Sequence, residues 1–177
     1  MAVDNAPANT VPVPEKAEAT GKRIAIIGGG PSGLAAAYYL ELMGHHAVVF
    51  EAKSKLGGML RYGIPSYRFP RERLDQDIEV ILSTGVEVHL NTKIGNGEGE
   101  VPFNNLREEY DAVYIAIGAH EDKKVGIEGE DSKGVISAVE MLGSIGEEVM
   151  PDFKDKNVVV IGGGNVAMDC TRSAIRL

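Results

Sequence analysis

The length, composition and charge of the chain already exclude several classes of protein. Its 177 residues include 44% hydrophobic side chains and 22 glycines, which is enough for one solid core or for one core and the start of another. The formal net charge of −8 leaves no broad basic surface for nucleic acid or for an anionic membrane. No apolar run approaches the roughly 20 residues of a membrane span, and the N-terminus lacks a secretory signal, so we expect a cytoplasmic protein.

The cysteine and histidine content excludes two kinds of site. Cys170 is the single cysteine, so these residues alone cannot form a disulfide or ligate an iron–sulfur cluster through cysteines. The four histidines show no metal-ligand spacing, and no metal site is predicted. The sequence also contains no nucleophile elbow and no zinc-protease motif, so we assign no catalytic side chain.

The first part of the sequence alternates between strand and helix patterns. Residues 1–21 are rich in Ala, Pro, Asn and Thr and are expected to form an extended, flexible arm. Residues 23–28 are a short apolar run ended by glycines, which predicts a buried parallel strand. A helix is predicted over 31–43, because proline suits its first turn and Gly44 suits its C-terminal end. The apolar segment 46–51 predicts a second strand.

The following segments continue this alternation. Residues 52–70 are punctuated by glycine and proline and are too long for an ordinary turn, so they predict a functional loop. A polar amphipathic pattern predicts a helix over 71–84. Strands are predicted at 86–90 and at 110–119, the latter buried, and a capping-box pattern predicts a helix over 137–149.

The strongest functional signal is the glycine sequence between the first strand and the first helix. Gly28, Gly30 and Gly33 form a G-x-G-x-x-G pattern, and Glu51 closes the next strand. The first glycine permits a tight turn, the second lets the backbone approach a pyrophosphate, and the third allows close helix–strand packing. Amides at the start of the helix would attract the diphosphate, and Glu51 would accept hydrogen bonds from an adenosine ribose. The alternative for such a pattern is a glycine turn that binds nothing.

A second glycine pattern lies near the end of the sequence. Residues 157–165 repeat the strand and the glycines of the opening segment, and a helix is predicted to follow. Gly162, Gly164 and Ala167 occupy the fingerprint positions, with Asn165 inside the pattern. A site for a second nucleotide, NAD(P)H, is therefore predicted. We expect this site to be incomplete, because no following strand presents the acid or arginine that distinguishes NAD from NADP.

Four stretches of the sequence resemble one group of flavoproteins. They are IAIIGGGPSGL, FEAKSKLGGMLRYGIP, YDAVYIAIGA and VVVIGGGNVAMD. Together they resemble the two-dinucleotide-binding-domain flavoproteins, most closely the small subunit of glutamate synthase and its relatives in NAD(P)H-linked electron-transfer complexes. The likeness covers about residues 22–177. Since members of this group are usually much longer, the resemblance also implies that this chain is a fragment or one piece of a split enzyme.

The resemblance implies two cofactors, FAD and NAD(P)H, and a set of binding residues. The ADP half of FAD would lie at the first glycine pattern, with the Ile94 backbone at the adenine edge. The loop after Glu51 would lie along the flavin or its pyrophosphate, and a short alanine-x-glycine element would mark the exit to the nicotinamide domain. The predicted cofactor-binding residues are Gly28, Gly30, Pro31, Ser32, Gly33, Glu51, Ala52, Gly57, Gly58, Met59, Arg61, Ile64, Pro65, Ile94, Ala116, Gly118, Gly162, Gly164, Asn165 and Ala167.

These patterns predict an α/β fold, in which a Rossmann-like FAD-binding domain with a parallel sheet precedes the start of a second Rossmann-like NAD(P)-binding unit. The predicted divisions are a flexible N-terminal arm (1–21), the FAD-binding domain (22–120), a connecting segment with a helix (121–155) and the beginning of the NAD(P)-binding domain (156–177).

The predicted function is hydride transfer from NAD(P)H to FAD, from which electrons pass to iron–sulfur centres of other domains or of a larger catalytic subunit. Two alternatives stay open. In the first, the chain is a non-catalytic FAD-holding or scaffolding piece of a larger electron-transfer complex. In the second, its first fold binds NAD in place of FAD, because both nucleotides share an ADP half. The adjacent Gly57 and Gly58 argue against NAD.

Overall fold

The computed structural model describes residues 12–177, which form two compact units. The first unit runs to Gly58 and resumes over Pro70–Gly118. The second unit consists of Met59–Phe69 and Ala119–Leu177. The predicted arm lies outside the described residues as far as residue 11, and its described part forms no helix or strand.

Strands and helices alternate along the first unit, as the sequence predicts, and only helices follow in the second. The short helices α2 and α4 were not predicted. In chain order the elements of the described residues are β1 (Arg23–Ile27), α1 (Pro31–Leu42), β2 (His46–Phe50), α2 (Met59–Tyr62), α3 (Arg71–Leu82), β3 (Glu87–His89), α4 (Phe103–Glu109), β4 (Ala112–Ile115), α5 (Ala138–Gly146) and α6 (Asn165–Arg176).

The strands of the first unit form one parallel sheet in the order β3-β2-β1-β4. β1 pairs with β2 from Arg23 opposite His46 to Ile27 opposite Phe50, and its other side pairs with β4. Parallel neighbours need a crossover connection, and α1 and α3 supply the crossovers from β1 to β2 and from β2 to β3. This topology confirms the predicted Rossmann-like α/β fold.

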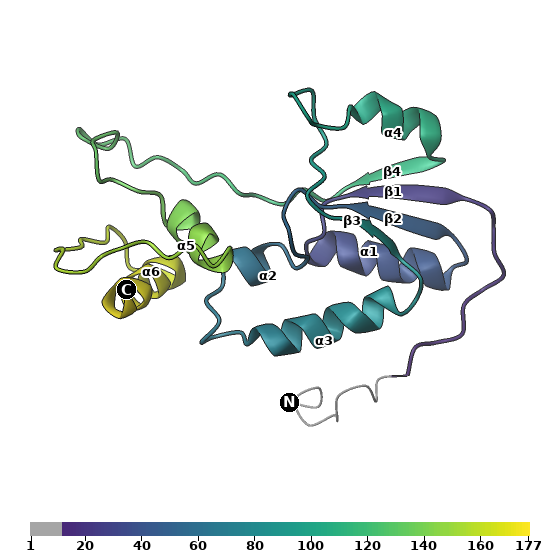
Figure 1. Ribbon diagram of the computed structural model, residues 1–177, viewed down its shortest axis with the longest axis horizontal. Coiled ribbons are helices and arrows are strands. Elements are labelled where there is room, and N and C mark those ends of the chain that lie inside the picture. The colour runs from purple at the N-terminus through teal and green to yellow at the C-terminus, as the bar shows by residue number, and fades with distance from the viewer. Residues whose placement is uncertain (1–11) are drawn as a thin grey trace. The chain divides into compact units, whose positions relative to one another are not determined.

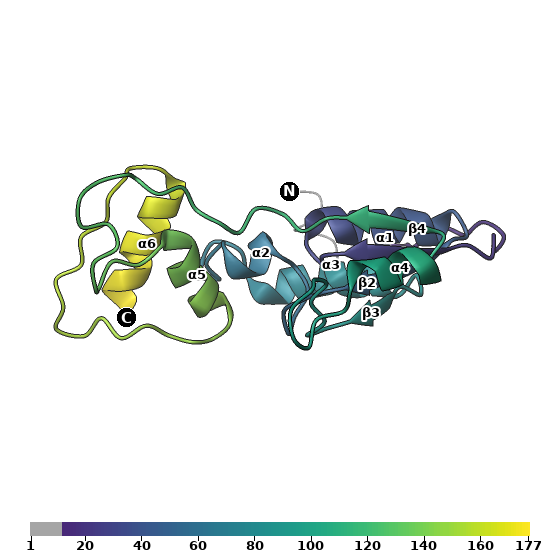
Figure 2. The same ribbon diagram turned by 90° about the horizontal axis from the view of Figure 1, so that it is seen from above.

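Different helices bury the two faces of the sheet. On one face the core consists of four strand residues and one residue of α4, namely Ala25, Ile27, Val48, Phe50 and Leu106. Ile26 and Val49 alternate with them along the strands and point to the opposite face, where α1 and α3 bury Leu34 and Leu74. Figure 1 shows α1 and α3 on one side of the strands and α4 on the other, and Figure 2, seen from above, shows α4 in front of them. Helices thus cover both faces, as parallel sheets require.

β4 differs from the buried strand that the sequence predicts at 110–119. It lies at the edge of the sheet, so that one of its sides has no partner strand within the described part of the chain. Tyr114 and Ile115 are 43% and 59% exposed. The prediction of a strand is confirmed and the prediction of its burial is wrong, because an apolar run does not reveal whether a neighbouring strand covers it.

The second unit is built from helices. α5 and α6 lie side by side (Figure 2) and pack around a small core of Met141, Leu142 and Cys170. Ser137 caps α5 as the capping-box pattern predicts, since its hydroxyl oxygen accepts hydrogen bonds from two amides of the first turn.

The strand predicted within 157–165, before the second glycine pattern, is not formed. These residues carry no strand assignment, and Val159 is 85% exposed. A strand is held by hydrogen bonds to a neighbouring strand, and the second unit contains no other strand within its described residues. Residues 157–165 have the composition of a strand, but no neighbouring strand pairs with them within the described residues of the second unit.

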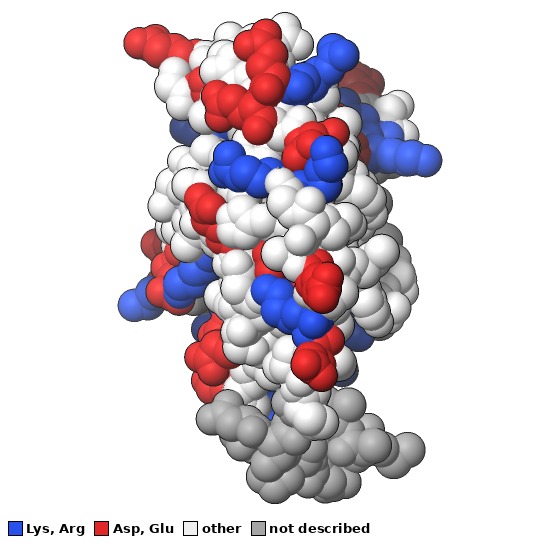
Figure 3. Space-filling view, turned by 90° about the vertical axis from the view of Figure 1, so that its right-hand side faces the viewer, with Lys and Arg blue, Asp and Glu red and all other residues white. Residues whose placement is uncertain are grey.

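The charged side chains form no single-sign surface on the face shown in Figure 3. There, acidic and basic side chains are interspersed. No helix of residues 12–177 is long and apolar enough to span a membrane.

The described part of the arm is tied to the first unit by backbone hydrogen bonds. The amide of Ala17 donates to the Leu42 carbonyl at 2.8 Å, and the amide of Thr20 donates to the Gly44 carbonyl at 2.9 Å. Gly44 has a φ of +82°, and a Cβ added to it would lie 2.1 Å from the Glu18 carbonyl oxygen. Only glycine therefore suits this position, both for its backbone conformation and for the close approach of the arm.

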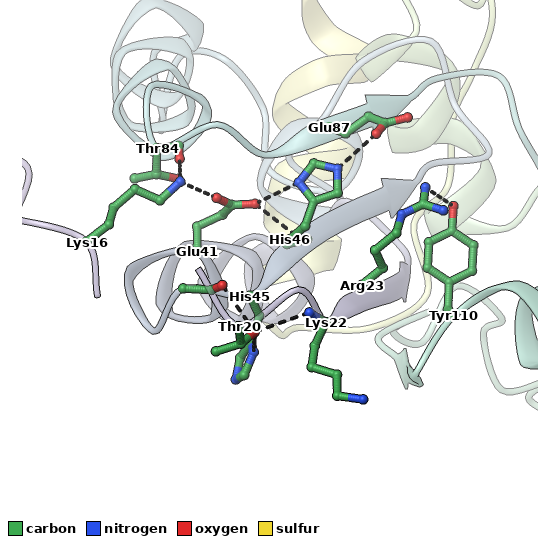
Figure 4. Close-up of polar contacts among 12 residues, drawn as sticks. Lys16, Thr20, Lys22, Arg23, Glu41, His45, His46, Thr84, Glu87 and Tyr110 are labelled. Atoms are coloured by element: carbon green, nitrogen blue, oxygen red, sulfur yellow. Dashed lines mark hydrogen bonds and ion pairs between the residues drawn. The ribbon is translucent and has the colours of Figure 1, made fainter. Parts of the chain in front are cut away.

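A buried carboxylate anchors the same arm through a charged contact (Figure 4). Glu41 of α1 is 3% exposed, and its carboxylate accepts hydrogen bonds from the Ala47 amide, at 2.8 Å, and from the Lys16 ammonium. The Lys16 ammonium also donates to the Thr84 carbonyl after α3. His46 completes the surroundings, with its Nδ1 3.5 Å from the carboxylate. The arm thus supplies a cation that a buried anion needs.

We expect Lys16→Met to lower the free energy of unfolding of the protein by about 1–3 kcal/mol, because the buried Glu41 carboxylate loses a charged donor. Equilibrium unfolding in urea measures the change. Lys22→Met is the matched control, since Lys22 pairs with Asp111 at an exposed position and its loss should cost less. Equal losses in the two variants would show that the Lys16–Glu41 contact has no special role.

Candidate functional site

The first glycine pattern forms a tight turn between β1 and α1. Gly28 has a φ of +108°, and its amide donates to the Phe50 carbonyl at 2.8 Å. A Cβ on Gly28 would lie 2.4 Å from the Ala116 carbonyl oxygen, and a Cβ on Gly33 would lie 1.9 Å from the Gly28 carbonyl oxygen. The turn therefore admits no side chain at either position, so that β1 and α1 approach closely.

The Glu51 carboxylate lies at this turn, directly after β2. Its Oε2 accepts a hydrogen bond from the Gly29 amide at 2.7 Å, and its Oε1 accepts one from the Lys53 amide at 2.8 Å. Glu51 is 7% exposed. A carboxylate has further lone pairs beyond these two bonds, so it can still accept hydrogen bonds from hydroxyl groups of a ligand. The acid and the glycine turn, which lie apart in the sequence, thus come together.

The loop after Glu51 closes over the same turn. The Gly57 amide donates to the Gly29 carbonyl at 2.8 Å. A Cβ on Gly58 would lie 2.7 Å from the Gly30 Cα, so the two backbones are in contact. The side chain of Leu56 lies against Gly29, where an added Cβ would approach its Cδ2 to 2.3 Å. Sequence reasoning missed Leu56, which is buried. Ala52, also predicted to bind the cofactor, lies exposed in this loop.

The start of α1 presents amides that no side chain caps. Gly30 is the N-cap residue and makes no side-chain cap, and Pro31 follows at the first helical position. The first intrahelical bond runs from the Leu34 amide to the Gly30 carbonyl, so the amides of Ser32 and Gly33 precede the hydrogen-bonded part of the helix. No acidic residue stands in the first turn. This end of the helix therefore favours an anion.

Ile94 lies in the first unit, in an isolated parallel bridge with Val101. Val101 bonds to the Lys93 carbonyl and to the Gly95 amide. In this bridge geometry, the amide and carbonyl of Ile94 itself point away from Val101. This pairing with Val101 therefore does not use the backbone groups of Ile94, which the sequence predicts at the adenine edge.

Ala116 and Gly118 follow β4. The Ala116 amide donates to the Ile27 carbonyl at 2.8 Å, which extends the β1–β4 pairing toward the glycine turn. Gly118 has a φ of +71° and is the last residue of the first unit. The alanine-x-glycine element therefore lies beside the first turn and ends where the chain leaves the unit.

Four predicted residues, Met59, Arg61, Ile64 and Pro65, belong to the second unit. Arg61 and Pro65 are buried, and Met59 and Ile64 are partly exposed. α2 packs against α5, where a Cβ on Gly146 would lie 2.7 Å from the Tyr62 Cα. The predicted domain 22–120 included this segment, whereas its contacts place Met59–Phe69 with Ala119–Leu177.

The second glycine pattern is open. Gly162 has a φ of +131°, and Gly164 is the N-cap of α6, where Asn165 is the first helical residue. Nothing lies within 4 Å of a Cβ added at Gly163 or Gly164. Gly162 approaches only Ala167, at 3.5 Å between the added Cβ and the Ala167 Cβ. The turn and the helix are formed as predicted, but no loop of residues 12–177 closes over them as one does at the first turn.

Sequence reasoning missed a polar cluster in the second unit. Arg68 donates from Nη1 to the Asp169 Oδ2 at 2.7 Å, and the Tyr67 hydroxyl lies 3.3 Å from the other carboxylate oxygen. Asp169 is 5% exposed, and the Arg176 guanidinium lies 4.4 Å from the centroid of the Tyr67 ring. The contacts attach the end of the segment Met59–Phe69 to α6. The one sequence signal for this cluster was Asp169, an acidic residue between Met168 and Cys170.

We expect Asp169→Asn to loosen this attachment, because the Arg68 guanidinium loses its charged partner. A loss of about 1–2 kcal/mol would raise tryptic cleavage after Arg68 by roughly 5- to 30-fold. The fragments are quantified by mass spectrometry. Cleavage after Arg107, in α4 of the first unit, is the internal control and should not change. Unchanged cleavage after Arg68 would contradict the role of Asp169.

Cys170 follows Asp169 on α6 and is 3% exposed. Burial, and secondarily the charge of Asp169, raise the pKa of its thiol above the ordinary value. A thiol held in its protonated form is a poor nucleophile. Since Cys170 is also the single cysteine, no dithiol chemistry resides in these residues.

Comparisons with known proteins agree with this arrangement. Residues 18–177 match the family described as pyridine nucleotide-disulphide oxidoreductase. The beta subunit of the NADP(+)-dependent formate dehydrogenase of Moorella thermoacetica is 47% identical over 159 residues, which are 89% of this chain and 22% of that protein. The small chain of the NADPH glutamate synthase of Escherichia coli (strain K12) is 38% identical over 167 residues, 89% of this chain and 35% of that one. The likeness to the glutamate synthase small subunit is thereby confirmed.

A solved structure shows the same fold. FprA of Mycobacterium tuberculosis in complex with NADPH is 31% identical to this chain and superposes with a TM-score of 0.72, over 85% of this chain and 36% of FprA. The chain therefore spans between 22% and 36% of the length of these relatives.

Proposed function

The chain belongs to the pyridine nucleotide-disulphide oxidoreductase family, and from that premise we propose that it is the FAD-binding part of an NAD(P)H-dependent flavin oxidoreductase. Electrons would pass from NAD(P)H through FAD to iron–sulfur centres of other domains or of a larger catalytic subunit. Relatives that are a beta subunit and a small chain support a place in an assembly of several subunits. The cytoplasmic location stays a prediction.

The first glycine turn fits the ADP half of FAD. Added side chains at Gly28 and Gly33 would strike the backbone, so both positions keep the turn compact, as a bound pyrophosphate requires. The single observation that carries the proposal is the Glu51 carboxylate, 2.7 Å from the Gly29 amide. It puts an acceptor for ribose hydroxyls beside the donors for a diphosphate, which is the pairing that this nucleotide demands.

Different residues of the first unit would contact different parts of FAD. The amides of Ser32 and Gly33 would donate to the diphosphate, and the helix dipole of α1 would add a favourable field. Glu51 would bind the ribose, and the amide and carbonyl of Ile94 would meet the adenine edge. Gly57 and Gly58 would keep the loop close to the diphosphate without a side chain in the way.

Other predicted roles rest on the resemblance. They are flavin contacts for Met59, Arg61, Ile64 and Pro65, flavin proximity for Ala116 and Gly118, and nicotinamide-nucleotide binding by Gly162, Gly164, Asn165 and Ala167. FAD, when bound, would supply the chemistry, since it accepts a hydride and releases electrons one at a time. The protein groups would bind and orient it, and no acid or base of the chain is needed for that step.

The alternative function is a non-catalytic one. In it the first unit holds FAD, but the chain does not react with NAD(P)H. The missing strand before the second glycine pattern, within residues 12–177, favours this alternative, because a nicotinamide-nucleotide site in a Rossmann fold lies at the carboxyl end of such a strand.

A reconstitution experiment separates these functions. The purified chain is mixed with FAD, freed of excess, and the nucleotide that stays bound is extracted and identified by mass. The proposal expects FAD in about equal amount to the protein. Anaerobic addition of NADPH or NADH should then bleach the flavin absorbance. Bound FAD that is not bleached supports the non-catalytic alternative, and bound NAD or no nucleotide at all contradicts the proposal.

A further inference from the structure

Two hydroxyl groups meet at the start of α1. The Ser32 Oγ lies 3.0 Å from the Tyr114 hydroxyl oxygen, which is a hydrogen-bonding distance. Ser32 is the second residue of α1, and Tyr114 belongs to β4. Neither the fingerprint nor the strand pattern assigns a role to Tyr114.

The sheet register explains why the tyrosine reaches this helix. Tyr114 is paired with Ile26 across β1 and β4, so both side chains point to the same face. The Ile26 side chain touches α1, where its Cγ2 lies 3.2 Å from a Cβ added at Gly33. The longer Tyr114 side chain, one strand farther out on this face, therefore arrives at the neighbouring Ser32.

Stability does not account for this pair. Tyr114 is 43% exposed and Ser32 is exposed, so water can satisfy either hydroxyl if the bond is absent. A bond between exposed neutral groups adds little to folding and restricts two side chains. Its effect is to hold the Ser32 hydroxyl in one place at the end of the helix that favours an anion.

The direction of the hydrogen bond leaves one proton for a ligand. Either hydroxyl can donate at this distance. We assign the donor role to the Tyr114 O–H and the acceptor role to the Ser32 oxygen, because the phenol is the more acidic of the two. The Ser32 hydrogen is then free to be donated onward, and a hydroxyl that accepts one bond becomes a stronger donor in the next. The natural acceptor at this position is an oxygen of an anion bound by the Ser32 and Gly33 amides.

We infer that Tyr114 is a positioning residue for the diphosphate of the bound nucleotide, acting through the Ser32 hydroxyl. The inference rests on the proposed function, because it assumes that FAD occupies the first glycine turn. It adds a residue of β4 to the elements that bind the diphosphate, besides the turn and the helix.

The test compares three ligands on the complete chain. Dissociation constants of FAD, ADP and adenosine are measured by calorimetric titration for the wild type and for Tyr114→Phe. We expect Tyr114→Phe to weaken FAD and ADP by about three- to tenfold, as for loss of one hydrogen bond. Adenosine, which has no diphosphate, should bind equally well to both. Tyr39→Phe is the matched control, since it removes an exposed phenol from α1 and should change none of the three constants.

A double-mutant cycle tests whether the effect passes through Ser32. Ser32→Ala should weaken FAD and ADP by a similar factor, and adding Tyr114→Phe to Ser32→Ala should have almost no further effect. Ser32→Thr keeps a hydroxyl and should retain the dependence on Tyr114. Unchanged FAD and ADP affinities in Tyr114→Phe, equal losses for adenosine, or fully additive losses would each overturn the inference. A wild-type chain that binds neither FAD nor ADP would instead refute the proposed function, and the inference with it.

Discussion

Replacing Glu51 by alanine is expected to weaken FAD binding by about 10- to 100-fold, which corresponds to one lost hydrogen bond to a charged acceptor. The carboxylate would bind the ribose. It also accepts hydrogen bonds from the amides of Gly29 and Lys53, at 2.7 and 2.8 Å. Its removal therefore takes away a ligand contact and loosens the glycine turn at the same time. The dissociation constant is measured by fluorescence titration of FAD.

Two further variants sharpen this prediction. Glu51→Gln keeps the shape of the side chain and one acceptor oxygen, so its affinity should fall between those of the wild type and of Glu51→Ala. Glu108→Ala removes an exposed carboxylate from α4 and should leave FAD binding unchanged. An FAD affinity of Glu51→Ala within a factor of about two of the wild type would remove Glu51 from the site.

Gly33→Ala is expected to abolish nucleotide binding and to lower the free energy of unfolding by about 2–3 kcal/mol, because the added methyl group overpacks a site with no space. The new Cβ would lie 1.9 Å from the Gly28 carbonyl oxygen and 3.2 Å from the Ile26 side chain. The nearer group is backbone, so α1 must move away from β1. That movement opens the turn on which the diphosphate would rest. Urea unfolding and FAD titration measure the two effects.

Gly163→Ala is the control for this substitution. It makes the same chemical change in a glycine turn, but no atom of the described part of the chain lies within 4 Å of the added Cβ. We expect its stability to remain close to that of the wild type. If Gly33→Ala were as stable as Gly163→Ala and still bound FAD, neither the stability of the fold nor FAD binding would require the close approach of β1 and α1.

The first glycine turn was predictable because its signal is local. The glycines of this turn are required by the backbone geometry of a few neighbouring residues. The segments that form β1, α1 and β2 have clear apolar patterns. The pairing of Glu51 with the turn follows from topology, since the ends of adjacent parallel strands lie at the same edge of a sheet. The structure places the carboxylate there, within hydrogen-bonding distance of Gly29.

Features that depend on distant partners were not predictable from the sequence. The apolar segments 110–119 and 157–162 look alike, yet the first pairs with β1 and the second pairs with no strand within the described residues. The Tyr114 contact with Ser32 depends on which residue of β4 stands opposite Ile26. The Arg68–Asp169 pair joins a turn residue, which lies between α2 and α3, to a residue of α6, and no periodicity connects the two positions.

The membership of Met59–Phe69 in the second unit limits how the protein can be dissected. The backbone passes from one unit to the other after Gly58, again after Phe69, and again after Gly118. A polypeptide ended at Gly118 would keep Arg68 but lose Asp169, so a buried partner of the inserted segment would be absent. Excision of the parallel sheet as a separate polypeptide needs a synthetic bridge from Gly58 to Pro70, and the excised segment Met59–Phe69 has to be supplied to the helical remainder as a separate peptide.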